Sequence, residues 1–159
     1  MSVDAAAGRF AHGGEVYTAV DLPGLYALTP HSADERAAVE ALMRSGGVIV
    51  QVAEAAALER SLRLAAELAA LRRPMVLALN MADELEKRGV RIDLCALTRT
   101  TGIPAVLISA RRGEGIDALL AAARHAPIPQ DGFDPRAAAA AAIVSTRKES
   151  RDDRIDRIV

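Results

Sequence analysis

The segment Asp21-Leu22-Pro23-Gly24 places a carboxylate and a glycine directly after an apolar stretch. An aspartate at the end of a strand can hold a metal-bound water, and Gly24 allows a backbone N–H to approach a terminal phosphate closely. Residues of these two types would suit a site that holds Mg²⁺ and a phosphate. On spacing alone, D-x-x-G is more often an ordinary strand-to-loop turn.

A second polar pair, Asn80 and Asp83, follows the apolar run 75–79, with Met81 between them. The Asp83 carboxylate can accept both the N1–H and the exocyclic amine of guanine, a bidentate pairing that adenine cannot offer. Asn80 can connect neighbouring loops. The alternative is that Asp83 is the N-cap of a following helix.

The third segment is Ser109-Ala110-Arg111, which follows the apolar run 105–108. The backbone N–H of Ala110 can donate to the carbonyl of guanine. The alternative is a plain strand-to-helix loop, closed by the glycines of 113–115.

The order and spacing of the three segments are more specific than any one of them. About 56 residues separate the first from the second, and about 26 separate the second from the third. Each follows a predicted strand, and ligands of open α/β sheets bind at the carboxyl edge of the strands. The arrangement is typical of guanine-nucleotide-binding domains.

The elements that must position these segments alternate along the chain. Glycine pairs, helix caps and apolar periodicity predict the following order. The first elements are a hairpin over 8–21 and a helix capped by Ser32 with Glu35. A strand over 48–52, a helix over 58–71, a strand over 75–79 and a short helix over 83–88 follow. The last elements are a helix from Asp93 to Gly102, a strand over 105–108 and a helix over 115–126. This alternation predicts an α/β fold with a parallel sheet covered on both faces.

Composition excludes several classes of function. Twenty Lys and Arg against 21 Asp and Glu give a net charge of -1, so we expect no nucleic-acid partner. Cys95 is the single cysteine, which excludes an internal disulfide; we expect it to be a small buried residue. The three histidines show no metal-ligand spacing, and no apolar run reaches the roughly 20 residues of a membrane helix. We therefore expect a cytoplasmic chain without a transmembrane segment.

Longer stretches around the three segments resemble a known family. They are 21–28 (DLPGLYAL), 58–60 (LER), 77–83 (LALNMAD) and 109–116 (SARRGEGI). Together they look like the N-terminal cytosolic G domain of FeoB, the bacterial ferrous-iron transporter. The end of the chain, 153–159 (DRIDRIV), resembles the stretch just before that family's first membrane helix.

The resemblance implies a three-layer P-loop GTPase-like (Ras-like) fold that binds GTP or GDP with Mg²⁺ and hydrolyses GTP slowly. It further implies coupling to iron(II) uptake through a membrane permease, at the cytoplasmic face of the inner membrane. Asp21 would act on Mg²⁺ through a water, and Ser2 falls near the switch threonine. The nucleotide-binding positions would be Asp21, Gly24, Asn80, Met81, Asp83, Ser109, Ala110 and Arg111.

The sequence departs from the family pattern in two places. The family begins with a strand and a phosphate-binding loop, G-x-x-x-x-G-K-[ST], and this motif does not occur among the 159 residues. Glu54-Ala55-Ala56-Ala57 also replaces the family's usual Asp-Ala-[ST]-Asn. Loss of the loop would weaken the binding of the nucleotide's phosphates. The alternative function is therefore a non-hydrolysing pseudo-GTPase that acts as a regulatory or interaction module.

We expect the chain to divide into a truncated G domain over 1–127 and a linker with a helical, charged tail over 128–159. The family's first strand lies between the strand ending at Asp21 and the strand 48–52. Without it, those strands either pair directly or leave open edges around a gap. Because open edges of apolar strands attract other chains, we expect marginal stability and self-association.

Overall fold

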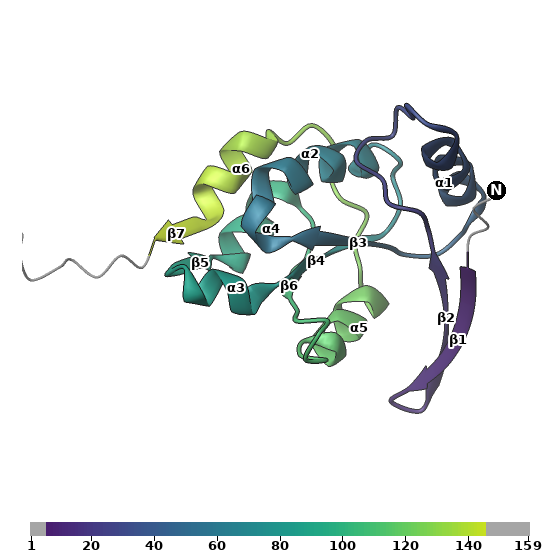
Figure 1. The fold of residues 1–159 in the computed structure, drawn as a ribbon, viewed down its shortest axis with the longest axis horizontal. Coiled ribbons are helices and arrows are strands. Elements are labelled where there is room, and N and C mark those ends of the chain that lie inside the picture. Colours follow the sequence, from purple (N-terminus) through teal and green to yellow (C-terminus); the bar gives the residue numbers. More distant parts are fainter. Residues whose placement is uncertain (1–5, 146–159) are drawn as a thin grey trace, which may run out of the picture.

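Strands and helices alternate along most of the chain in the computed structural model, which describes residues 6–145 (Figure 1). The strands are β1 (Ala6–His12), β2 (Glu15–Asp21), β3 (Ile49–Glu54), β4 (Met75–Asn80), β5 (Val90–Ile92), β6 (Ala105–Leu107) and β7 (Ile143–Ser145). The helices are α1 (Ala33–Arg44), the short 3-10 helix η1 (Ala55–Ala57), α2 (Leu58–Ala69), α3 (Ala82–Lys87), α4 (Leu94–Thr101), α5 (Ile116–Arg124) and α6 (Pro135–Ala142). Every element predicted from the sequence is confirmed, with shifts of a few residues at its ends.

A parallel sheet with strand order β3-β4-β6 forms the centre of the molecule. Val52 pairs with Ala78, and Ala78 pairs in turn with Val106. The first five residues of β4 are fully buried, which suits a central strand with a continuous apolar sequence. The α/β prediction is therefore confirmed, and the carboxyl ends of β4 and β6 meet at one edge.

Helices α2, α4 and α6 pack together on one face of this sheet, and α5 lies on the other (Figure 1). The core between them is built from aliphatic side chains, among which Leu62, Leu77 and Leu97 are fully buried. Helix α6 adds three buried alanines, whose small side chains let it approach α2 and α4 closely. The result is the predicted three-layer arrangement.

Strand β3 is the exception to the prediction that the sheet is covered on both faces. Its residues alternate, with Ile49, Gln51 and Ala53 buried and the intervening side chains exposed. Val50 is 42% exposed and Val52 is 63% exposed. Helix α5 contacts β4 and β6, and so leaves the outer face of β3 open.

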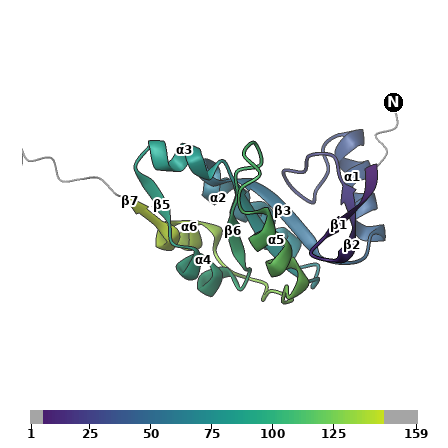
Figure 2. The same cartoon turned by 90° about the horizontal axis from the view of Figure 1, so that it is seen from below.

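The hairpin β1–β2 is a separate two-stranded sheet at one end of the molecule (Figures 1 and 2). Gly13 and Gly14 have φ values of 58° and 80°, as the predicted primed turn requires. Side chains attach the hairpin to α5: His12 Nε2 lies 3.3 Å from Asp117 Oδ1, and Arg124 pairs with Glu15. Among the described strands β2 pairs only with β1, so β2 and β3 do not pair directly. Of the two alternatives, the structure shows the one in which both strands keep an unpaired edge.

Helix α1 begins at the predicted cap. Ser32 Oγ accepts a hydrogen bond from the Glu35 N–H at 3.1 Å. The Glu35 carboxylate accepts from the N–H of His31 at 2.7 Å, one residue earlier than in a standard capping box. The cap therefore satisfies two backbone donors at the start of the helix.

The second half of the chain contains two strands that the sequence did not predict. The short strands β5 and β7 pair antiparallel, with Ile92 opposite Ile143, so the alanine-rich helix is followed by a strand. Cys95 is exposed, and the prediction that it is buried was wrong. The charged run 147–157 lies outside the described residues. Within 6–145, no helix is long and apolar enough to cross a membrane.

Candidate functional site

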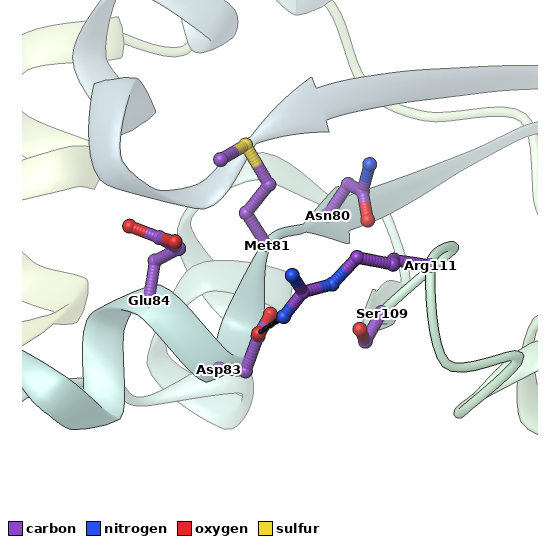
Figure 3. Close-up of a pocket in the computed structure, with 6 residues that line it drawn as sticks. All are labelled: Asn80, Met81, Asp83, Glu84, Ser109 and Arg111. Atoms are coloured by element: carbon purple, nitrogen blue, oxygen red, sulfur yellow. Dashed lines mark hydrogen bonds and ion pairs between the residues drawn. The ribbon is translucent and has the colours of Figure 1, made fainter.

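An open pocket of about 200 Å³ lies where β4 and β6 end, beside the start of α3 (Figure 3). Its lining combines residues of two of the motifs found in the sequence with the neighbouring Glu84. They are Asn80, Met81, Asp83, Glu84, Ser109 and Arg111. The parallel register of β4 and β6 brings these two motifs together, as predicted for the carboxyl edge of an open sheet.

The loop after β6 is closed by its own backbone. Ser109 and Glu114 exchange two hydrogen bonds, of 3.1 and 3.2 Å, and Ser109 is buried. Gly115 follows with φ 81°, and a Cβ at this position would lie 2.3 Å from the carbonyl oxygen of Leu107. A side chain at residue 115 would therefore collide with the end of β6, so only glycine allows this loop to turn so close to the strand.

Asn80 connects the two motifs, as the sequence predicted. Its Oδ1 accepts a hydrogen bond from the N–H of Ala110 at 3.0 Å. The next residue, Met81, has φ 65°, a left-handed conformation that costs a non-glycine residue about 1–2 kcal/mol. The chain thus makes a sharp turn between the end of β4 and the start of α3.

The carboxylate of Asp83 lies in the first turn of α3 and its side chain is only 10% exposed. It is not the N-cap of that helix, which was the alternative interpretation, because α3 already begins at Ala82. Its Oδ2 lies 3.1 Å from Arg111 Nη2 and 3.9 Å from Arg112 Nη2. Figure 3 shows the Arg111 side chain reaching from the loop after β6 to this carboxylate.

Glu84 is a lining residue that sequence reasoning missed. None of the three sequence motifs includes Glu84, because neighbouring acids in a short helix usually form its solvated face. Glu84 does pair with Lys87 and Arg88 on that face, but it also borders the pocket. Its position next to Asp83 in the first turn was the signal that could have found it.

The first motif lies away from this pocket. Asp21 ends β2, and both it and Gly24 are exposed; neither residue lines the pocket. The loop that follows is fixed to α2 by a 2.6 Å hydrogen bond from the Leu28 N–H to Glu67 Oε2. Leu25, in the same loop, packs against the core. Ser2 lies outside the described residues.

A Mg²⁺ site needs several oxygen ligands in octahedral geometry. Asp21 is one carboxylate, and residues 6–145 contain no group of three His, Cys, Asp or Glu residues that could hold a metal ion.

Comparison with known proteins identifies relatives of the chain. Residues 1–123 match the family model FeoB_N, described as ferrous iron transport protein B. A curated relative, the Fe(2+) transporter FeoB of Methanocaldococcus jannaschii, is 38% identical over 65 residues, which is 40% of this chain and 10% of that protein.

Solved structures extend the match to the fold. The G domain of FeoB from Methanococcus jannaschii is 35% identical, with a TM-score of 0.70 and 76% of each chain covered. The cytosolic domain of L. pneumophila FeoB is 35% identical, with a TM-score of 0.73, covering 79% of this chain and 54% of that one. That of T. maritima FeoB in its GMPPNP form is 32% identical, with a TM-score of 0.74, covering 79% and 50%.

The chain thus spans about half the length of the two bacterial cytosolic domains. The family match covers more than three quarters of its residues, and the G-domain structure supports the same assignment. On these grounds the chain belongs to the ferrous iron transport protein B (FeoB) family, and its fold is that of the family's N-terminal G domain.

Proposed function

We propose that this chain is a guanine-nucleotide-binding domain of a ferrous-iron transport protein, with the base held in the pocket at the ends of β4 and β6. The observation that carries the proposal is the meeting of Asn80, Asp83 and the loop of Ser109 and Arg111 in one pocket. Two of the structural relatives are described as GDP and GMPPNP forms, so related domains bind guanine nucleotides.

The base would be selected by hydrogen-bond pattern. Guanine presents two neighbouring donors, N1–H and the exocyclic amine, and the Asp83 carboxylate can accept from both. The N–H of Ala110 would donate to the guanine carbonyl, after release from Asn80. Adenine presents an acceptor where guanine has N1–H, so it would leave a buried carboxylate oxygen unpaired.

The phosphates would lie toward the loop after β2. There, a backbone N–H at Gly24 would approach the terminal phosphate, and Asp21 would hold a Mg²⁺-bound water. The 159 residues contain no G-x-x-x-x-G-K-[ST] loop, whose backbone N–H groups and lysine hold the phosphates in P-loop proteins. We therefore expect these residues on their own to bind nucleotide weakly and to be impaired in hydrolysis.

The wider role follows from the family. We propose that nucleotide binding and hydrolysis are coupled to iron(II) uptake through a membrane permease, with this domain on the cytoplasmic side. The open edges of β2 and β3 make self-association a further part of the proposal.

A second candidate function is a pseudo-GTPase that acts as a regulatory or interaction module without hydrolysis. One observation favours it: Arg111 already forms an ion pair with the Asp83 carboxylate, the group that would otherwise bind the base. The two functions differ in whether guanine nucleotide binds at the pocket at all.

Titration of the chain with a fluorescent GDP analogue tests the proposal. We expect saturable binding, in the micromolar range or weaker, that is lost in Asp83→Ala and kept in Glu40→Ala, which removes an exposed carboxylate on α1. Binding that survives unchanged in Asp83→Ala would overturn the assignment of the base pocket. Absence of binding at any concentration would favour the interaction module.

A further inference from the structure

The two groups expected to bind a guanine base, the Asp83 carboxylate and the Ala110 N–H, already have hydrogen-bond partners within the chain. The Asp83 carboxylate faces the guanidinium of Arg111 at 3.1 Å, and the N–H of Ala110 donates to Asn80 Oδ1 at 3.0 Å. The two contacts come from successive residues of one loop. A base entering the pocket must therefore exchange partners with the protein at both points.

The chemistry of Arg111 makes it more than a neutral neighbour. A guanidinium is a planar group with N–H donors on nitrogens that share one carbon. The N1–H and exocyclic amine of guanine are likewise donors on two nitrogens that share one carbon. An arginine side chain can therefore offer a carboxylate the same donor pattern as the guanine edge, and it carries a positive charge in addition. In the structure, one of these donors, Arg111 Nη2, contacts Asp83 Oδ2.

The two partners differ in how freely they can move. Asp83 is fixed in the first turn of α3, and its side chain is 10% exposed. The side chain of Arg111 is 76% exposed and extends from a loop, so it can move into water with little loss of packing. Arg112, the next residue, lies farther from the carboxylate, at 3.9 Å, and is itself within 3.9 Å of Glu114.

We infer that Arg111 competes with guanine for the base pocket. When no nucleotide is bound, Arg111 pairs with the Asp83 carboxylate, and guanine must displace Arg111 to bind there. This inference rests on the proposed function and adds a means of regulating it. The Arg111–Asp83 pair opposes the binding of guanine nucleotide and favours its release. Arg111 is thus assigned a role opposite to that of a ligand-holding residue.

The test compares Arg111→Gln with Arg112→Gln in titrations with a fluorescent GDP analogue. Both variants remove one positive charge from the same loop, and circular dichroism confirms that each is folded. We expect Arg111→Gln to bind about twofold to fivefold more tightly than the parent, as the usual strength of a partly exposed ion pair implies. Arg112→Gln is expected to change affinity by less than twofold.

A double-mutant cycle checks the contact without nucleotide. Thermal unfolding of the parent, Arg111→Gln, Asp83→Asn and the double variant is expected to show non-additive shifts of Tm. Additive shifts would overturn the inference, because the pair would then not form in solution.

The outcomes separate the two proposals. Equal or weaker GDP binding by Arg111→Gln, with binding by the parent, overturns the competition and leaves the proposed function intact. Weaker binding would mean that Arg111 holds the nucleotide instead. If neither the parent chain nor Arg111→Gln binds GDP, both the proposed function and the competition are wrong. If only Arg111→Gln binds, both proposals are supported.

Discussion

Asp83 is the residue on which base selection depends in the proposed site. A mismatched adenine edge leaves a polar group of the pocket unpaired, which typically costs about 1–3 kcal/mol, or about fivefold to a hundredfold in affinity. We expect GDP to compete with the fluorescent analogue better than ADP by a factor in this range. In Asp83→Ala, any residual binding at high concentration should no longer distinguish GDP from ADP. Equal competition in the parent chain would remove Asp83 from this role.

Asp21 supports a second prediction, on hydrolysis. No residue of the 159 matches the lysine of a phosphate loop, and Asp21 alone cannot neutralise the charge that develops on a transferring phosphoryl group. Steady-state phosphate release from GTP should therefore equal that of buffer. Asp21→Ala and the control Asp34→Ala, an exposed acid on α1, should give the same rate. Turnover that is lost only in Asp21→Ala would contradict this expectation.

The sequence predicted which residues of the base pocket meet, but it did not predict the contacts they make there. Asn80, Asp83 and Ser109 follow strands that are parallel neighbours, so their approach follows from topology. The pair between Asp83 and Arg111 depends on side-chain rotamers across two loops, and motif spacing carries no information on rotamers. The exposure of Cys95 escaped prediction for a related reason, since which side of α4 faces the core depends on tertiary packing.

At the scale of elements, the turn between β6 and α5 depends on Gly115. In Gly115→Ala the new Cβ would meet the carbonyl oxygen of Leu107 at 2.3 Å, and the residue would also keep a positive φ. Gly113 is a matched control, because its φ is also positive but a Cβ there would meet nothing within 4 Å.

We expect Gly113→Ala to lower the free energy of unfolding by about 1–2 kcal/mol, the cost of the left-handed conformation alone. Gly115→Ala should lower it by about 1–3 kcal/mol more, because backbone must shift to remove the overlap. Denaturant unfolding of the two variants measures the difference. Equal losses would mean that the loop relaxes freely and that the close approach to β6 is unimportant.

Elements with a strong local pattern were predictable, and those without one were not. Strand β4 is a continuous apolar run bounded by Pro74 and Asn80, and α4 has a capping aspartate and a final glycine in the left-handed conformation. The strands β5 and β7 have three residues each and pair across about 50 residues of chain. Such short segments become strands only because α4 and α6 bring them together, and no local pattern records that contact.

For the molecule as a whole, the decisive feature is that the hairpin and the central sheet do not pair with each other. Two side-chain contacts attach the hairpin to α5: the ion pair of Arg124 with Glu15, and the approach of His12 to Asp117. An exposed ion pair contributes only about 0–1 kcal/mol. In the described sheets the outer edge of β3 has no paired strand. The outer face of the same strand carries Val50 and Val52, which are substantially exposed. Unpaired backbone and apolar side chains thus coincide on β3.

We therefore expect the isolated chain to be marginally stable and to self-associate through these edges. Elution in size-exclusion chromatography should shift with protein concentration, and thermal unfolding should fall within or below about 45–65 °C, the usual mesophile range. Val52→Lys should weaken the association, because a charge on an edge strand opposes pairing with another chain. Its side chain is 63% exposed, so the substitution should barely change the Tm.

Val144→Lys is the matched control for that substitution, since it places the same charge on a valine that is 47% exposed on β7, away from the gap. It should leave the association unchanged. If Val52→Lys and Val144→Lys behave alike, the contact does not involve β3. A cooperative monomer that melts well above 65 °C at every concentration would contradict the prediction entirely. A short parallel sheet with one uncovered strand has few other sources of stability. Such a high Tm would therefore require the unpaired edge of β3 and the loosely attached hairpin to lower the free energy of unfolding far less than unpaired strands normally do.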